Sequence, residues 1–273
     1  MNFLQPNSLA DALQWKSQHG DDARFLAGGT DLVVLRNRGL VRGRVWIDLS
    51  QVGELRTLQT TDEALQIGAM CPHAWLEESP LTALAEAAAS IGGPQIRNRG
   101  TVGGNVGNAS PAGDLSVALL AHDAHVTLRS LRGVRTLPLT EFFLAPGKTA
   151  LAPDEMITQF QLSNRLRSAW HKVGKRDATA ISVVAAAVSQ GPAGEVRVAL
   201  GSVAPRPLRV TPVEAMLSRD GLTPDSARAA GDMVRELIQP ISDHRASADY
   251  RRDVAGTIVS RLLHQLLDPP VRS

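Results

Sequence analysis

Cysteine is nearly absent from this sequence: among 273 residues there is only Cys71. A single thiol cannot close an internal disulfide, and a structural zinc site or an iron–sulfur cluster needs several cysteines. The seven histidines are scattered and show no His-Glu-x-x-His spacing. Any redox chemistry must therefore come from an organic cofactor or from a partner protein.

Long apolar runs are also missing. No stretch approaches the roughly 18–20 apolar residues that cross a bilayer, and Met1–Pro6 lacks the basic and then apolar layout of a signal peptide. Hydrophobic residues make up 43% of the chain and charged residues 21%, the composition of an ordinary globular protein with a buried core. We therefore expect a cytoplasmic protein.

Aromatic residues are few, at 4%, and the net charge is only +2 although the pI is about 9. The arginines are spread along the whole chain instead of forming one stripe. Nucleic-acid binding requires a basic patch, often with aromatic side chains for stacking. The sequence disfavours that class of function.

The chain divides near Ser163–Ser168. Beyond this segment, the β-rich runs Ile181–Ser189 and Glu195–Val203 flank Gly191–Gly194, which predicts an antiparallel hairpin. Apolar residues at helical spacing then predict three helices: Thr211–Ser218, Thr223–Leu237 and Tyr250–Leu267. We expect an α+β protein with two domains, residues 1–165 and residues 166–273.

The first region mixes short strands and helices. Helices are predicted from Leu9 to Gly20 and from Leu81 to Ser90, where Gly92-Gly93-Pro94 ends the second. Leu32–Leu35 is compatible with either a helix or a strand. Strands are predicted at Arg24–Ala27, Val45–Leu49 and Ala64–Ala69, and as a hairpin at His125–Leu128 and Gly133–Leu137.

Two glycine-rich segments carry the strongest functional signal, Leu26–Leu32 and Gly100–Asp114. Adjacent glycines let successive backbone N–H groups point inward and form a concavity that binds phosphate oxygens. A single Gly-Gly pair is usually a tight turn, but two segments so poor in large side chains favour a nucleotide site. Asp114 suits a sugar or a ring N–H better than a phosphate. Further donors are available from Thr30, Thr101, Asn105, Asn108 and Ser110.

The commoner nucleotide motifs do not fit. No register of Gly100–Gly107 places glycines as Gly-x-Gly-x-x-Gly, so the Rossmann fingerprint is absent. Gly147-Lys148-Thr149 resembles the end of a Walker A loop, but Phe142 stands where that loop needs its first glycine. We interpret Gly147–Thr149 as an ordinary turn.

The second segment nevertheless resembles a known family. Gln95–Asn105 followed by Ala109–Asp114 is similar to the FAD-binding medium subunit of the xanthine dehydrogenase and carbon monoxide dehydrogenase family, the molybdenum hydroxylases. The resemblance spans nearly the whole chain in the right order. It is also carried by Ala27–Asp31, Phe142-Phe143, Gly147–Thr149, Pro153–Ile157, Lys172–Asp177, Gly201–Pro205, Ser242–Arg245 and Tyr250–Arg252.

This resemblance implies an FAD-binding domain of the vanillyl-alcohol-oxidase (PCMH) type, with subdomains of about residues 1–55 and 56–165, and an α+β C-terminal domain that covers the flavin. It also implies a hetero-oligomer, with two copies of each subunit. In it, a molybdopterin-binding large subunit oxidises the substrate and a small subunit with two [2Fe–2S] clusters passes electrons on. The FAD of this subunit then hands them to NAD⁺, oxygen, quinone or a carrier.

The resemblance also implies where FAD binds. Leu26–Val33 and Thr101–Asn105 would line the diphosphate and ribityl chain, and Asp114 would hold the ribityl chain or the ring edge. Ile157 would contact the flavin or adenosine, Lys172 would lie near the isoalloxazine, and Ile91 falls where some relatives place an aromatic ring. We expect no catalytic residue and no metal ligand in this chain. The expected FAD-binding residues are Leu26, Ala27, Gly28, Gly29, Thr30, Asp31, Leu32, Val33, Ile91, Thr101, Val102, Gly103, Gly104, Asn105, Asn108, Ser110, Asp114, Ile157 and Lys172.

Several alternatives stay open on the residues alone. Arg97 and Arg99 face either phosphate or the iron–sulfur subunit. A self-contained FAD-dependent oxidase or reductase of the same superfamily would use the same fold, but it usually needs a substrate-facing acid, base or covalent flavin link. Neither glycine-rich segment contains His or Cys. A non-enzymatic binding module, in which the glycines are only structural, is the third reading.

Overall fold

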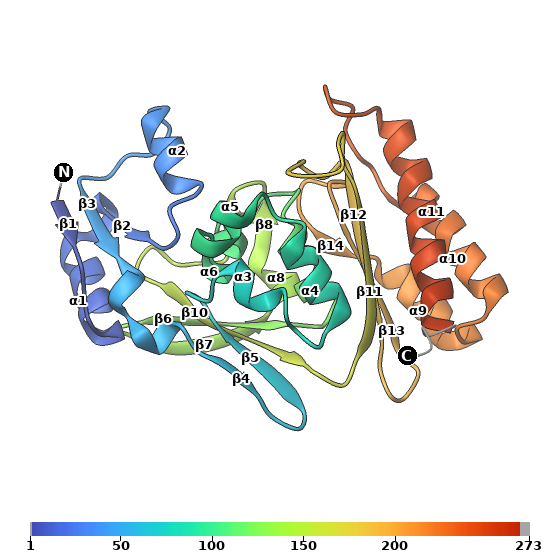
Figure 1. Ribbon diagram of the computed structural model, residues 1–273, viewed down its shortest axis with the longest axis horizontal. Coiled ribbons are helices and arrows are strands. Elements are labelled where there is room, and N and C mark those ends of the chain that lie inside the picture. Colours follow the sequence, from blue (N-terminus) through green and yellow to red (C-terminus); the bar gives the residue numbers. More distant parts are fainter. Residues whose placement is uncertain (1, 268–273) are drawn as a thin grey trace.

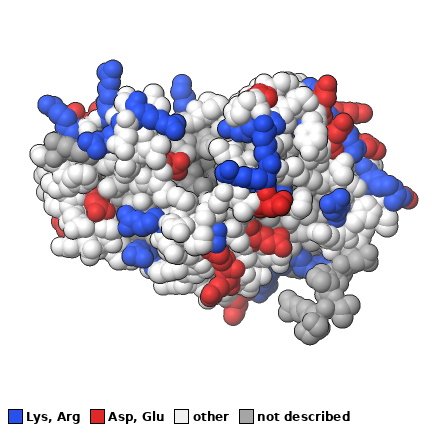
Figure 2. All heavy atoms as spheres, turned by 45° about the horizontal axis from the view of Figure 1, so that its top comes forward, with Lys and Arg blue, Asp and Glu red and all other residues white. Residues whose placement is uncertain are grey.

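A computed structural model describes residues 2–267 of the chain. In Figure 1 the N-terminal sheet lies at one end, a central sheet with helices above it occupies the middle, and a third sheet backed by helices forms the other end. No helix within residues 2–267 is long and apolar enough to cross a membrane. On the face shown in Figure 2, Lys and Arg lie at several separate places with acidic side chains between them.

The N-terminal sheet has three parallel strands in the order β1-β3-β2. Helix α1 packs its apolar side, including Leu9 and Leu13, against this sheet, and its N-terminus is capped by the Ser8 side chain. Leu32–Asn37, left open between helix and strand, is helical. The elements are β1 (Asn2–Leu4), α1 (Leu9–His19), β2 (Ala23–Leu26), α2 (Leu32–Asn37) and β3 (Val45–Asp48).

The central sheet has five antiparallel strands in the order β4-β5-β10-β6-β7. The predicted hairpin is confirmed as β6 and β7, with His125 opposite Pro138. The central strand β10 is not predicted from the sequence. The strands are β4 (Leu58–Thr60), β5 (Ala64–Gly68), β6 (His125–Ser130), β7 (Gly133–Pro138) and β10 (Met156–Ser163).

Short helices cover the central sheet. Part of the second glycine-rich segment, Gly100–Asp114, is helical, since α6 lies within it and α5 directly precedes it. Gly147 has a φ of 67° in the tight turn between β8 (Phe143–Ala145) and β9 (Lys148–Thr149), so the predicted turn there is confirmed. The helices are α3 (His73–Leu76), α4 (Thr82–Ala89), α5 (Pro94–Arg99), α6 (Val102–Gly107), α7 (Asp114–Ala121) and α8 (Leu139–Phe142).

The third sheet has four antiparallel strands in the order β11-β12-β13-β14. The predicted hairpin of this region is confirmed as β12 and β13, and so are the three helices that follow. Helix α7 packs on β12 and β13, which also contact α11 and α9 respectively. The elements are β11 (Arg167–Val173), β12 (Val184–Gln190), β13 (Val196–Gly201), β14 (Leu208–Arg209), α9 (Thr211–Asp220), α10 (Pro224–Leu237) and α11 (Ala248–Leu267).

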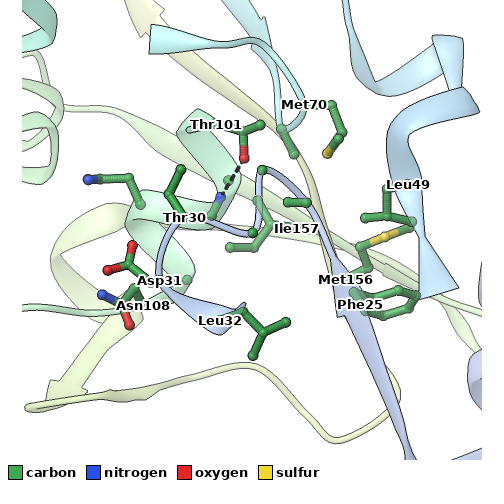
Figure 3. Close-up of a pocket in the computed structure, with 18 of the residues that line it drawn as sticks. Phe25, Thr30, Asp31, Leu32, Leu49, Met70, Thr101, Asn108, Met156 and Ile157 are labelled. Carbon is green, nitrogen blue, oxygen red and sulfur yellow. Dashed lines mark hydrogen bonds between the residues drawn. The ribbon is translucent and has the colours of Figure 1, made fainter. Parts of the chain in front are cut away.

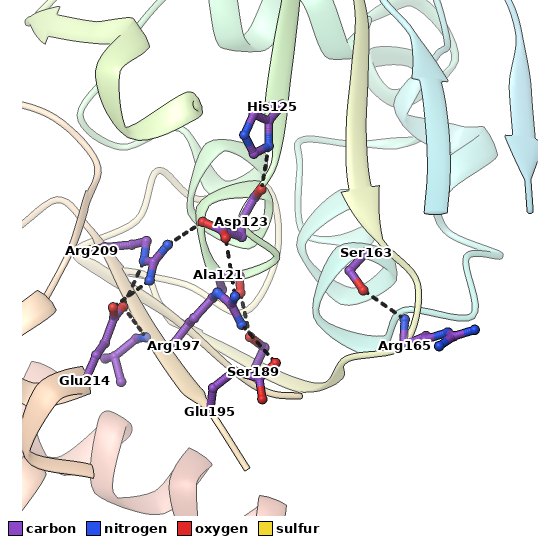
Figure 4. Close-up of polar contacts among 11 residues, drawn as sticks. Ala121, Asp123, His125, Ser163, Arg165, Ser189, Glu195, Arg197, Arg209 and Glu214 are labelled. Atoms are coloured by element: carbon purple, nitrogen blue, oxygen red, sulfur yellow. Dashed lines mark hydrogen bonds and ion pairs between the residues drawn. The ribbon is translucent and has the colours of Figure 1, made fainter. Parts of the chain in front are cut away.

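Polar contacts tie the third sheet to the end of α7 (Figure 4). Arg197 and Arg209 both form ion pairs with Asp123, and Arg209 also pairs with Glu214 at 2.6 Å. The Ser189 hydroxyl donates to the Ala121 carbonyl at 2.6 Å. These side chains are partly or fully buried, so the contacts position the third sheet against the central part.

Candidate functional site

A cavity of about 390 Å³ lies where the N-terminal sheet meets the central helices. This volume is within the range of small-molecule sites, roughly 300–1,000 Å³. Both glycine-rich segments contribute to its wall. The residues that line it are Arg24, Phe25, Ala27, Gly28, Gly29, Thr30, Asp31, Leu32, Leu35, Leu49, Ala69, Met70, His73, Ile91, Ile96, Thr101, Gly103, Gly104, Asn105, Gly107, Asn108, Leu151, Glu155, Met156 and Ile157.

The first glycine-rich segment presents free backbone donors. The N–H groups of Gly28, Gly29, Thr30 and Asp31 make no hydrogen bond to any residue that the structure describes. Gly29 has a φ of 77°, which a residue with a Cβ rarely adopts. The segment leads directly from β2 into α2, so its amides lie at a helix N-terminus. Such a row of amides suits the oxygens of an anionic group.

The second segment uses its amides differently. The Val102 N–H donates to the Cys71 carbonyl at 3.0 Å and the Gly103 N–H to the Ala69 carbonyl at 2.8 Å. The Gly104 N–H donates to the Thr101 hydroxyl, which caps α6, at 3.1 Å. The row of free amides expected in both segments therefore occurs in the first, whereas in the second the fold itself occupies the amides of Val102, Gly103 and Gly104 and leaves the Thr101 N–H without a partner among the described residues.

Close packing explains the glycines of the two segments. A Cβ on Gly28 would lie 2.0 Å from the Arg99 carbonyl oxygen, and one on Gly103 would lie 2.7 Å from the Ala69 Cβ. Real Cβ atoms do not approach other atoms so closely. Gly28 thus lets the first segment lie directly on the backbone at Arg99–Gly100, and the two segments form one continuous wall.

The two ends of the cavity differ in polarity. Figure 3 shows Phe25, Leu49 and Met156 together at one end and Asp31 and Asn108 at the other. The first end offers apolar contacts to a flat ring. The second offers hydrogen-bonding groups, bordered by Ile157.

Three polar side chains of the cavity wall have unused capacity. The Asp31 carboxylate is exposed and makes no hydrogen bond or ion pair with any described residue, and partial desolvation by its neighbours raises its pKa. The Asn105 Oδ1 and the His73 Nδ1 are buried without a partner among residues 2–267. Burial lowers the pKa of His73 to about 4. This set of groups fits a dinucleotide. The free amides suit its phosphates, the carboxylate and the amide oxygen suit its hydroxyl groups, and the apolar end suits a flat ring.

Comparison with known families identifies the class of protein. Residues 1–163 match the family described as the FAD binding domain in molybdopterin dehydrogenase. Residues 169–266 match the CO dehydrogenase flavoprotein C-terminal domain. The chain belongs to this family. It is an FAD-binding subunit of the molybdenum hydroxylase type of dehydrogenase, and the resemblance seen in the sequence is confirmed.

Curated relatives match over almost their whole length. The carbon monoxide dehydrogenase medium chain of Hydrogenophaga pseudoflava is 32% identical over 96% of this chain and 95% of its own. A subunit alpha of the 6-hydroxypseudooxynicotine dehydrogenase complex of Paenarthrobacter nicotinovorans is 33% identical over 97% of this chain and 94% of its own. These relatives are subunits of dehydrogenases, so the chain is an oxidoreductase component.

Solved structures show the same fold. The carbon monoxide dehydrogenase of Hydrogenophaga pseudoflava superposes with a TM-score of 0.89 at 32% identity, over 97% of this chain and 96% of the matching chain. Quinoline 2-oxidoreductase from Pseudomonas putida 86 gives a TM-score of 0.89 at 26% identity, over the same shares of both chains. The expected combination of an FAD-binding domain and a smaller C-terminal domain with an antiparallel sheet is confirmed.

Asp114 and Lys172 lie together, but they do not line the cavity formed by the two glycine-rich segments. The Lys172 Nζ is 2.6 Å from the Asp114 Oδ2 and donates to the Ser90 carbonyl at 2.9 Å. The hydroxyls of Ser182 and Ser90 also donate to the Asp114 carboxylate. Burial raises the pKa of Asp114, and Lys172 opposes that rise. The buried pair joins α4 and α7 to β11, and its contact with FAD stays a prediction.

A second cavity of about 680 Å³ is lined by both Ser90 and Lys172. Arg97, another of its lining residues, donates to Glu77 at 2.7 Å and to the Gly92 carbonyl at 3.1 Å. Arg97 thus has partners within the protein, and it does not line the first cavity. The remaining residues are Glu86, Ala89, Gly92, Trp170, His171, Val173, Gly174, Arg176, Asp177, Ala178, Thr179 and Ala180.

Four other expected FAD-binding residues do not line the first cavity: Leu26, Val33, Val102 and Ser110. Val102 is fully buried, Val33 is exposed, and the other two are half-buried. The sequence does not point to several residues that do line this cavity. His73 is one of these, because its place beside Gly100 depends on an antiparallel bridge between Pro72 and Thr101 that no local pattern reveals. No group of three or more His, Cys, Asp or Glu that could hold a metal occurs within residues 2–267.

Proposed function

We propose that this chain carries FAD as an electron-transfer subunit of a cytoplasmic molybdenum hydroxylase complex. In this proposal it receives electrons from the [2Fe–2S] clusters of a small partner subunit and passes them to NAD⁺ or another acceptor. A molybdopterin-binding large subunit oxidises the substrate. The observation that carries the proposal is the full-length match to medium subunits, combined with a cavity whose first segment offers four free amides.

The cavity residues would share the work of holding FAD. The amides of Gly28–Asp31 would bind the diphosphate. The Asp31 carboxylate would accept hydrogen bonds from ribityl hydroxyls, and the side-chain amides of Asn105 and Asn108 would donate to these hydroxyls or accept from them. Ile91 and Ile157 would border the flavin, and the apolar end would take the adenine. When bound, FAD supplies the electron-transfer chemistry, and the protein positions it and tunes its surroundings.

The other redox centres would belong to partner subunits. A [2Fe–2S] cluster is usually held by four cysteines, whereas Cys71 is the single cysteine of the sequence. Its thiol is buried and donates to the Thr57 carbonyl, and burial raises its pKa to about 11. A thiol with this pKa is a poor metal ligand at neutral pH, because the ligand form is the thiolate.

We propose that residues 1–165 form the FAD-binding domain and residues 166–273 the C-terminal domain.

Co-expression of the tagged chain with its neighbouring genes would test this function. We expect a yellow-brown complex with flavin and iron–sulfur absorbance, in which substrate bleaches the flavin only when all subunits are present. The isolated chain should bind FAD but not be reduced by the substrate. A chain that purifies alone and whose flavin is reduced directly by a small molecule would contradict the subunit assignment, and a chain that takes up no FAD would contradict the cofactor.

A further inference from the structure

His73 occupies a distinctive place behind the contact between the two glycine-rich segments. It is the first residue of α3, and its N–H donates to the Gly100 carbonyl at 3.0 Å. A Cβ on Gly100 would lie 2.8 Å from the His73 Cδ2 and 3.0 Å from its Nε2, whereas a Cβ on Gly28 would lie 3.0 Å from the Gly100 Cα. Only Gly100 therefore separates the imidazole from the residue at which the row of free amides begins.

The imidazole has no partner in the protein. His73 is 3% exposed, lines the FAD-binding cavity and makes no side-chain hydrogen bond within residues 2–267. Burial lowers its pKa to about 4, so the ring is neutral at pH 7 and carries one N–H donor. Buried polar groups are nearly always hydrogen-bonded, and an exception calls for a missing partner.

The surroundings indicate what this partner is. The Val102, Gly103 and Gly104 amides of the same wall already donate to protein oxygens, which leaves the Thr101 N–H as a free amide there, and a side-chain N–H from His73 would add a second donor. The row of free amides in the first segment begins at Gly28, which lies against Gly100, and such amides suit the oxygens of an anionic group. An imidazole N–H donates well to such oxygens.

We propose that His73 is a ligand of the FAD diphosphate, donating its ring N–H from the part of the wall beside Gly100, next to the free amides of the first segment. This inference rests on the proposed binding of FAD in the cavity. It extends that site to α3, an element outside both glycine-rich segments.

Two substitutions separate a ligand role from a packing role. His73→Leu keeps an apolar body of similar size but has no donor, and His73→Gln keeps an N–H donor. We expect His73→Leu to bind FAD about tenfold more weakly, the value of one hydrogen bond to a charged group, and His73→Gln to recover most of this loss. His125→Leu is the matched control, because His125 is exposed and lies outside the cavity.

Titration of the apo chain with FAD and with ADP would measure the effect, alongside the thermal midpoint of each apo variant. ADP contains the diphosphate without the flavin, so we expect His73→Leu to lose the same factor for both ligands. Equal FAD affinity in wild type and His73→Leu would overturn the inference, whether or not the thermal midpoint of the variant is lowered. A loss of affinity for FAD without an equal loss for ADP would also overturn it. Failure of the wild type to bind FAD would instead overturn the proposed site.

Discussion

Replacing Gly28 by alanine tests the two-segment wall directly. The new Cβ would lie 2.0 Å from the Arg99 carbonyl oxygen and 2.8 Å from the Arg99 carbonyl carbon. Both neighbours belong to the backbone, so no side-chain rotation relieves the contact. Because Cβ atoms do not approach closer than 3.0 Å, the segments must separate by at least 1.0 Å (3.0 minus 2.0).

The magnitude follows from this separation. Overpacking of this kind costs about 1–3 kcal/mol of folding stability. A shift of 1 Å also moves the free amides out of the roughly 2.7–3.2 Å range of a hydrogen bond to an anion. If two bonds to charged oxygens are lost, each worth about 1.5–3 kcal/mol, FAD affinity falls by roughly 100-fold or more.

The assay is fluorescence titration of the apo chain with FAD, together with the flavin content of the purified protein. Gly53→Ala is the matched control, because a Cβ there meets nothing within 4 Å and the backbone does not require glycine. We expect Gly53→Ala to bind FAD as the wild type does. A Gly28→Ala protein that binds FAD within twofold of the wild type would refute the close-contact reasoning.

Three further predictions concern neighbouring parts of the chain. Gly104→Val should abolish FAD retention, because a Cβ at this position would already lie 3.0 Å from the Thr101 hydroxyl and valine adds two further methyl groups. Normal flavin content in this variant would show that α6 is not at the cofactor. Lys172→Met should lower the unfolding free energy measured in urea titrations by about 3 kcal/mol, because it leaves the Asp114 carboxylate buried without its cation. The double variant Lys172→Met/Asp114→Asn should recover part of the lost free energy. Burial lowers the pKa of His122 to about 4 from 6.5, so between pH 4 and pH 6.5 the unfolded chain binds a proton at this residue more readily than the folded chain. Wild-type stability therefore falls as pH drops from 6.5 to 4, by up to about 3 kcal/mol from this group, and thermal melts of His122→Leu should show a shallower pH dependence.

Local patterns predicted much of the fold. The β12–β13 hairpin and helices α9–α11 are visible in the sequence because their periodicity and turn residues lie within a few positions of one another. The strand β10 is not, since its pairing with β5 joins Phe160 to Ile67 across most of the central region. Its alternation is also weak, with three buried residues in a row at Met156–Thr158.

The candidate site, like the fold, could be predicted from the sequence only in part. Composition predicted that the glycines permit a close backbone approach, but it could not tell whether the approaching group is a cofactor or another backbone. At Gly28 and Gly103 that group is protein, at Arg99 and Ala69 respectively. Likewise, Asp114 finds its partner Lys172 only through the packing of α4 against both β11 and α7, which no spacing along the chain encodes.

Helix α7 has a consequence for how the molecule unfolds. All eight of its residues, Asp114–Ala121, are buried, since the central core covers one side and β12 and β13 cover the other. A helix that is buried on every side and mostly apolar is stable only while both coverings stay in place. The two halves of the chain, although they match separate families, should therefore melt as one cooperative unit with a single calorimetric transition, and a chain shortened to residues 1–165 should aggregate instead of folding alone.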